Sequence, residues 1–201
     1  MRNANRTTYR LAATGSVLAL LACAFATGVS PAEPAKESAP EAQPLQPLGF
    51  LLGHCWRGSF PDGKSVDTHC FEGVYGKFVR DRHFVQREGA DYCGESVYWW
   101  DPRARAVTYL YFNSDGGTST GTMTAAGQRL QFADEVYTAP DGDKQTYRTS
   151  WMRGEKGYVA VTEQQKQGGW KEAWRIEFTR MEPDAGSTAK ERAVACQHTT
   201  R

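Results

Sequence analysis

A regular alternation of apolar and polar residues is the feature that most constrains this chain, and it runs from about residue 53 to residue 180. Turn-forming stretches such as PDGK, SDGG and PDGD interrupt it about every ten residues. Aromatic and β-branched residues fill the runs between these turns, as is typical of β-strands. We therefore expect strands over residues 53–60, 65–74, 77–88, 94–101, 106–113, 118–124, 128–137, 144–153, 157–166 and 170–180.

Short strands joined in chain order form an antiparallel meander. A long meander with one apolar face closes most easily into a barrel, because closure removes both exposed sheet edges. The expected fold class is all-β: a calycin-like, antiparallel up-and-down β-barrel of about ten strands. Only the stretch LGFLL, residues 48–52, indicates a short helical turn, just ahead of the first strand.

The N-terminal segment, residues 1–26, has the features of an export signal. Arginines precede an apolar run, Leu11–Ala26, that is too short to span a membrane. Ala24–Ala26 matches the small-x-small cleavage pattern, whereas Leu20–Cys23 resembles a lipoprotein box that would place a lipid on Cys23. Both readings stay open. Each predicts an exported protein, periplasmic or secreted, and the second adds lipid anchoring to a bacterial membrane.

Composition divides the rest of the chain. Residues 27–47 are rich in Pro, Ala and Glu and predict a disordered tether. The barrel domain is expected over residues 48–182, followed by a C-terminal tail over residues 183–201. Lys and Arg number 24 against 23 Asp and Glu, with no basic tract, so we expect no nucleic-acid partner.

The first hairpin has a well-defined register. An Asp62-Gly63 turn places Cys55 opposite Cys70 and Trp56 opposite His69. Large apolar residues share the face of Trp56 and His69, so this face should be interior and the cysteines exterior. Since neighbouring strand residues point to opposite faces, the two His-Cys pairs of this hairpin cannot converge on one ion, and we expect no metal site.

The cysteines that follow the signal segment predict disulfides. Cys55 and Cys70 are directly opposite each other, at a separation that a disulfide can bridge in an oxidising compartment. Parity then pairs Cys93 with Cys196, and a free Cys196 is the alternative.

Later hairpins bring polar residues to the same interior. A turn at residues 75–76 places Arg80 opposite Phe71, with Arg82 on the same inward face. A turn at residues 168–169 places Glu163 opposite Trp174. A turn at residues 141–142 pairs Phe132 with Trp151 and Val136 with Tyr147, which adds an aromatic wall. The expected ligand-binding residues are Trp56, His69, Arg80, Arg82, Tyr147, Trp151, Glu163, Glu172 and Trp174.

Several stretches resemble a known superfamily. LLGHCWRG resembles the Gly-x-Trp opening strand of lipocalins and their calycin relatives, although two residues here separate Gly53 from Trp56 instead of one. GESVYWWD, GGTSTGTM, GQRLQF and WKEAWRIEFTR resemble small bacterial β-barrel domains of unknown function that share this fold with nitrobindins. The resemblance implies a barrel with an internal cavity. Nitrobindin-like barrels bind haem through a histidine from a late strand, but no histidine lies between His83 and His198, so we expect no haem and no other cofactor.

The residues permit more than one function. The leading hypothesis is an exported barrel that binds a small apolar or amphipathic ligand, with the arginines receiving an anionic group. Arginine–glutamate pairs that only stabilise the interior are an alternative. An isomerase or hydrolase with Glu172 or Glu163 as acid/base is another. A third alternative is an envelope interaction protein with a filled barrel.

Overall fold

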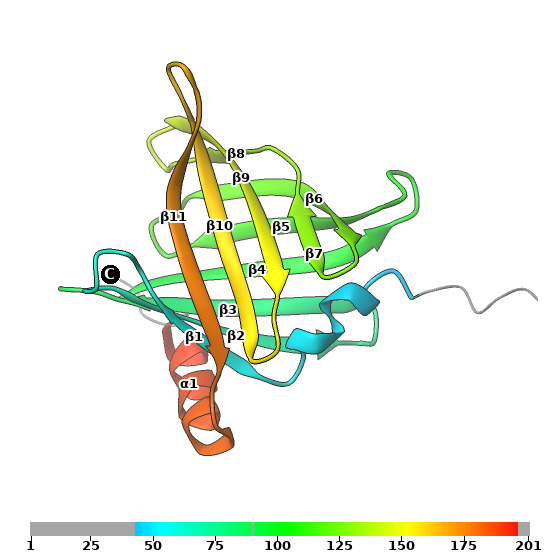
Figure 1. The fold of residues 1–201 in the computed structure, drawn as a ribbon, viewed down its shortest axis with the longest axis vertical. Helices are drawn as coiled ribbons and strands as arrows, with labels where there is room; N and C mark the ends of the chain where they lie inside the picture. The colour runs from blue at the N-terminus through cyan, green and yellow to red at the C-terminus, as the bar shows by residue number, and fades with distance from the viewer. Residues whose placement is uncertain (1–42, 90, 197–201) are drawn as a thin grey trace, which may run out of the picture. The chain divides into compact units, whose positions relative to one another are not determined.

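The computed structural model describes residues 43–89 and 91–196, so the expected signal segment, Cys23 and most of the expected tether lie outside the described residues. The described chain is all-β apart from two helices (Figure 1). Its elements are η1 (Gln46–Leu51), β1 (Cys55–Ser59), β2 (Val66–Val74), β3 (Phe78–Gln86), β4 (Tyr92–Asp101), β5 (Ala106–Asn113), β6 (Thr118–Ala126), β7 (Arg129–Phe132), β8 (Glu135–Thr138), β9 (Lys144–Arg153), β10 (Gly157–Lys166), β11 (Gly169–Arg180) and α1 (Pro183–Cys196).

The strands close into an antiparallel barrel. Apart from β7 and β8, which do not pair with each other, each strand pairs with the next along the chain, and the ring closes because β1 pairs with β11. β7 and β8 are two short strands that follow one another between β6 and β9, and each pairs with both of these strands. Together they occupy a single strand position, so the eleven strands form a ten-stranded ring. The predicted up-and-down barrel of about ten strands is confirmed.

One end of the barrel is packed shut. The short 3-10 helix η1 buries Leu48 and Leu51 completely in the core. The Trp56 indole Nε1 donates a hydrogen bond to the carbonyl oxygen of Leu51, 3.3 Å away. Phe50 meets Trp56 and Tyr158 edge to face. This end is therefore a solid apolar core, and the helical turn expected before the first strand is present.

Helix α1 covers the outside of β1, β2 and β3, in a region where the sequence predicts only a tail (Figure 1). Ala189 and Ala193 pack on the Cys55–Cys70 disulfide and on Phe84. The cysteines thus point out of the barrel, as expected, but the helix buries them. A second disulfide joins Cys93 on β4 to Cys196 at the end of α1, with 6.0 Å between their Cα atoms.

The first hairpin has the predicted register, and the second does not. Cys55 pairs with Cys70, and Trp56 with His69. In the β2–β3 hairpin Tyr75 adopts a φ of 52°, so the loop includes residue 77 and Phe71 pairs with Asp81 instead of Arg80. A one-residue shift exchanges the two faces of a strand. The expectation that Arg80 and Arg82 point inward is therefore wrong.

The two arginines instead join carboxylates on the outer face. Arg82 Nη1 lies 2.7 Å from the Glu72 carboxylate, and Arg80 Nε lies 3.1 Å from that of Glu95. Since the four side chains alternate in charge across β2, β3 and β4, they form a network that holds these strands together.

The last hairpins differ from prediction in the same way. The β10–β11 turn centres on residues 167–168, and a bulge follows at Thr162/Glu163, so Glu163 pairs with Glu172 and not with Trp174. Glu163 forms an ion pair with Arg148, and Glu172 with Arg175, away from the interior. The partners of β9 also differ from prediction. Tyr147 pairs with Glu135 of β8 instead of Val136, a shift of one residue, and Trp151 pairs with Leu130 of β7 instead of Phe132, a shift of two residues.

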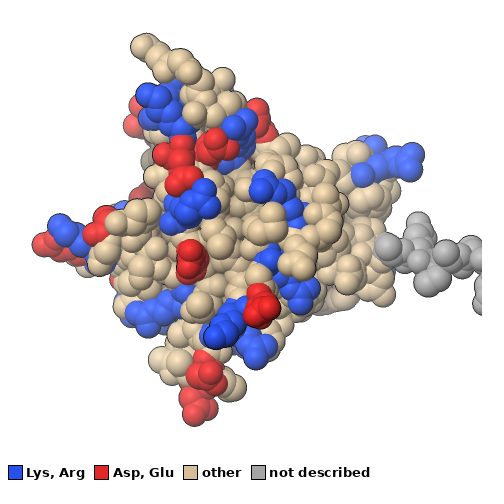
Figure 2. All heavy atoms as spheres, viewed as in Figure 1, with Lys and Arg blue, Asp and Glu red and all other residues tan. Residues whose placement is uncertain are grey.

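Acidic and basic side chains are interspersed over the face of the molecule shown in Figure 2. Within residues 43–89 and 91–196, neither helix has the length and apolar character that a membrane crossing requires.

Candidate functional site

A cavity of about 610 Å³ occupies the half of the barrel that η1 does not fill. Asp62 of the β1–β2 turn and Arg87 after β3 line it, and because both are exposed the cavity reaches solvent at this end. Almost half of the residues that line it are aromatic: Phe60, Tyr92, Tyr98, Tyr109, Tyr111, Phe132, Tyr137, Tyr147, Trp151, Tyr158, Trp174 and Phe178. Its size is within the range of pockets that hold small molecules.

The aromatic wall is continuous. Trp151 lies 4.7 Å from Phe132 and 5.2 Å from Tyr158, measured between ring centroids. Tyr158 stacks on Phe178 at 4.8 Å. Each ring holds its neighbour in place, so the wall is preformed and not assembled when a ligand arrives.

A cluster of two aspartates and two histidines forms one side of the interior, on β2 and β3. His69 Nδ1 lies 2.7 Å from Asp81 Oδ2, and His69 Nε2 lies 3.0 Å from Asp67 Oδ2. His83 Nδ1 lies 3.2 Å from the other oxygen of Asp67. The imidazoles stack with 4.7 Å between centroids. This interleaving follows from register, because His69 is directly opposite His83 and two residues from Asp67.

Burial and charge act in opposite directions on this cluster. Burial disfavours the charged form of His69, but the carboxylates of Asp67 and Asp81 outweigh it and raise the pKa of His69 well above its usual value. For Asp67 burial likewise opposes ionisation, and contact with His69 and His83 lowers its pKa despite this. The Asp67 carboxylate is therefore charged and lies beside the imidazolium of His69.

Tyrosines extend the cluster across the barrel. His83 Nε2 lies 3.4 Å from the Tyr111 hydroxyl, which lies 2.5 Å from the Tyr92 hydroxyl. Burial raises the pKa of Tyr92 to about 12, so its phenol is neutral and can donate a hydrogen bond. A Cβ atom at residue 94 would lie 2.2 Å from His83 Nε2 and 2.8 Å from the Tyr111 oxygen. Gly94 thus provides the space in which the imidazole and the phenol meet.

Glu135 is the carboxylic acid that β8 contributes to the cavity lining. Its Oε2 accepts hydrogen bonds from the Tyr109 hydroxyl at 2.7 Å and from the Ser119 hydroxyl at 2.8 Å. Burial raises the pKa of Glu135, although both hydrogen bonds lower it. A half-buried acid with a raised pKa can accept or donate a hydrogen bond to a bound molecule.

The structure brings together only part of the predicted ligand-binding set. His69, Tyr147, Trp151 and Trp174 line the cavity. Trp56 is buried in the packed end beside η1. The four charged members of the set lie on the outer face: Arg80, Arg82, Glu163 and Glu172.

The sequence did not indicate the residues that replace them: Asp67, Asp81, His83, Tyr109 and Glu135. Asp67 could have been found, since it is two residues from His69 in the one hairpin whose register was predicted correctly. Asp81, His83 and Glu135 depend on hairpins with a shifted register.

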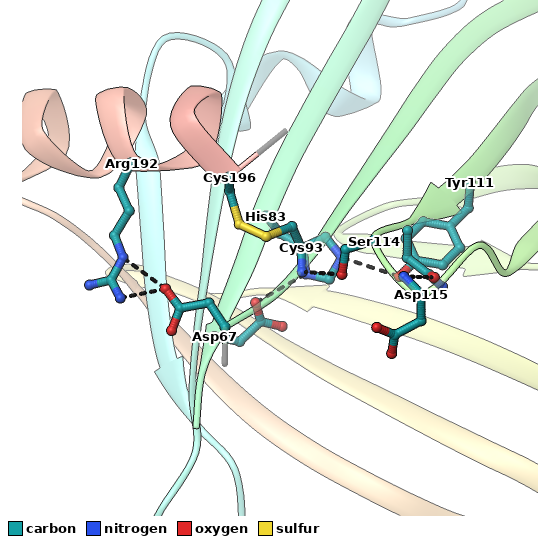
Figure 3. Close-up of a disulfide and its surroundings, with 10 residues drawn as sticks. Asp67, His83, Cys93, Tyr111, Ser114, Asp115, Arg192 and Cys196 are labelled. Carbon is teal, nitrogen blue, oxygen red and sulfur yellow. Dashed lines mark hydrogen bonds and ion pairs between the residues drawn. A yellow bond between two sulfur atoms is a disulfide. The ribbon is translucent and has the colours of Figure 1, made fainter. Parts of the chain in front are cut away.

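The Cys93–Cys196 disulfide lies close to the cluster, on the other side of the barrel wall. Figure 3 shows Cys196 at the last turn of α1 joined to Cys93, with His83, Asp67 and Tyr111 in the surroundings of the bond. Arg192 of α1 also pairs with Asp91 just before β4. These links tie α1 to the strand that carries Gly94 and Tyr92.

Comparisons with known proteins identify the fold. No family model matches the chain, and no curated protein matches it. Among solved structures, the crystal structure of Rv2717c from M. tuberculosis is similar, with a TM-score of 0.52 and 16% sequence identity. The match covers 72% of this chain and 99% of that chain. At this identity the likeness shows a shared barrel fold.

Proposed function

We propose that this protein binds a small amphipathic molecule, uncharged or cationic, inside its barrel. The cavity lined by aromatic rings carries the proposal, because it combines a volume of about 610 Å³ with apolar walls and a few fixed polar groups. A barrel filled by its own side chains, as the interaction-protein alternative requires, would leave no such space.

The charges of the interior support a ligand without negative charge. Asp67, Asp81 and Glu135 are acidic, and the arginines expected to receive an anion lie on the outer face. Arg87 lines the entrance, where its guanidinium lies 5.4 Å from the centre of the Tyr92 ring. Aromatic faces beside a carboxylate favour cations, and Glu135 favours a hydrogen-bond donor.

Export is part of the proposal. Two disulfides support an oxidising compartment, since such bonds are rare where thiols are kept reduced. We propose that the protein acts in the periplasm or outside the cell, with lipid anchoring through Cys23 as the alternative to release.

A matched pair of probes tests the proposal. N-Phenyl-1-naphthylamine is uncharged, and 8-anilinonaphthalene-1-sulfonate has the same ring skeleton with an added sulfonate. Trp151 and Trp174 line the cavity, so energy transfer from tryptophan to the naphthyl group reports binding. We expect the uncharged probe to bind and the sulfonate to bind at least about tenfold more weakly, because an unpaired anion meets buried carboxylates.

Two variants locate the binding. Ala160 lines the cavity from β10, so Ala160→Phe should fill it and abolish binding of the uncharged probe. Val161 is its neighbour on the other face of the same strand, and Val161→Phe should leave affinity unchanged. Binding that survives Ala160→Phe in a folded protein, or tighter binding of the sulfonate, would contradict the proposal.

A further inference from the structure

Three side chains of the interior present metal-ligand atoms to one another. Asp67, His69 and His83 each offer a donor atom, and these atoms lie within 4.8 Å of one another. The arrangement is built into the sheet: two ligands occupy alternate positions of β2, and the third lies directly opposite on β3. The sequence predicted no metal site, because the His-Cys pairs of the first hairpin point to opposite faces.

We propose that Asp67, His69 and His83 form a binding site for a divalent transition-metal ion, of the kind that prefers imidazole and carboxylate ligands. The Asp67 carboxylate lies 3.0 Å from His69 Nε2 and 3.2 Å from His83 Nδ1. Ligand atoms at about 2.0–2.2 Å from a tetrahedral ion lie about 3.3–3.6 Å apart. The two distances to Asp67 are close to this range and end on its two different oxygens, and the three donor atoms as a set lie within 4.8 Å. The rings are stacked at an angle of 15°, so an imidazole must rotate about its Cβ–Cγ bond to direct both nitrogens at one ion.

The second ring nitrogen of each histidine contacts a hydrogen-bonding group, as is usual for histidines that bind metals. A ligating histidine usually donates its second ring N–H to a carboxylate or another acceptor. Asp81 Oδ2 lies 2.7 Å from His69 Nδ1, and the Tyr111 hydroxyl lies 3.4 Å from His83 Nε2. Asp81 is 2% exposed and its other oxygen has no hydrogen-bond partner, so a nearby positive charge would stabilise it.

Charge balance favours a divalent ion. An M²⁺ ion on His69 Nε2 would replace the proton that this nitrogen shares with Asp67, and would place two positive charges beside the carboxylates of Asp67 and Asp81. All three ligands line the cavity, so the remaining coordination position faces it. The ion would therefore add a Lewis-acidic contact for a nitrogen or oxygen atom of a cavity ligand.

Cobalt titration tests the site. Protein without a polyhistidine tag is stripped with a chelator, dialysed and titrated with Co²⁺, whose visible absorption reports low-coordinate nitrogen and oxygen ligation. Zn²⁺ competition then gives the zinc affinity. We expect one ion per chain and visible bands that Zn²⁺ abolishes. The absence of stoichiometric binding would overturn the proposal.

Variants assign the ligands. His83→Gln should weaken zinc binding by at least about 100-fold, and Asp81→Asn by about 10- to 100-fold because it removes only the partner of a ligand. His54 is exposed and stands apart from the cluster, so His54→Ala is the control and should keep wild-type affinity. Near-UV circular dichroism of each metal-free variant verifies folding. Equal zinc affinity in folded His83→Gln and wild-type protein would refute the assignment.

Discussion

Gly94 on β4 lies directly opposite His83 on β3, and a Cβ atom at residue 94 would lie 2.2 Å from the imidazole Nε2. Because backbone on both sides holds the two residues, Gly94→Ala must displace the His83 ring from Asp67. We expect the free energy of unfolding to fall by about 1–3 kcal/mol. Denaturant unfolding measures it.

Gly73 on β2 provides the control for this substitution. It has no atom within 4 Å of an added Cβ, so Gly73→Ala should change the stability by less than about 1 kcal/mol. If both alanine variants were equally stable, the close packing of Gly94 against His83 would be wrong.

The raised pKa of Glu135 predicts a pH-dependent stability difference. Burial is its cause, and a group with a raised folded-state pKa contributes stability that is present below the unfolded pKa and is lost as pH rises through the folded pKa. Glu135→Gln keeps an oxygen that can accept from Tyr109 and Ser119 but cannot ionise. The variant should therefore gain stability relative to wild type as pH rises from about 4 towards neutrality.

Urea unfolding of both proteins across this pH range checks the prediction. The difference in free energy of unfolding should widen with pH. A difference that stays constant would show that Glu135 titrates as it does in the unfolded chain.

The outer-face position of Arg82 predicts a separation of stability from binding. Arg82→Met removes ion pairs to Glu72 and Glu95 and should lower the free energy of unfolding by about 1–3 kcal/mol, between the values for exposed and buried pairs. The affinity for N-phenyl-1-naphthylamine should stay within about twofold of wild type, because Arg82 does not line the cavity. A large change in probe affinity would instead support the inward register.

The disulfides should contribute unequally to stability. Cys93 and Cys196 are 103 residues apart in sequence, whereas Cys55 and Cys70 are 15 apart. In the chain-entropy description, closing loops of these lengths contributes about 4.7 and about 3 kcal/mol. Replacing Cys93 and Cys196 by alanine should therefore cost more than the same change at Cys55 and Cys70, and should speed amide hydrogen exchange along α1. Unchanged exchange in α1 would mean that packing alone holds the helix.

Strand positions followed closely from the sequence, because hydrophobic alternation and turn residues are local signals. The first hairpin was predicted to the residue, since Asp62 and Gly63 specify one tight turn and its Asp62 carboxylate accepts from the Lys64 and Ser65 backbone amides. The short helical turn before β1 and the Cys55–Cys70 bond followed from the same local patterns.

The inward or outward orientation of side chains was predicted wrongly wherever the sequence allowed a turn of two different lengths. Tyr75, a bulky residue with positive φ, lengthens the β2–β3 loop by one residue, which the residue types do not signal. No residue type in the sequence indicates the bulge at Thr162/Glu163 either. Each shift moves charges between faces, so the interior set was partly wrong. The strands were right except over residues 128–137, which form two strands, β7 and β8, instead of one. Helix α1 was missed because its contact surface is small alanines held by a disulfide, not an apolar stripe.

The central claim is that the open half of the barrel holds a small molecule without negative charge. A crystal structure of the protein with N-phenyl-1-naphthylamine tests it most directly. We predict electron density for the probe inside the cavity, against Trp151 and Tyr158, with its amine directed at Glu135. A cavity that contains only water, with the probe bound on the outer surface, would contradict the account.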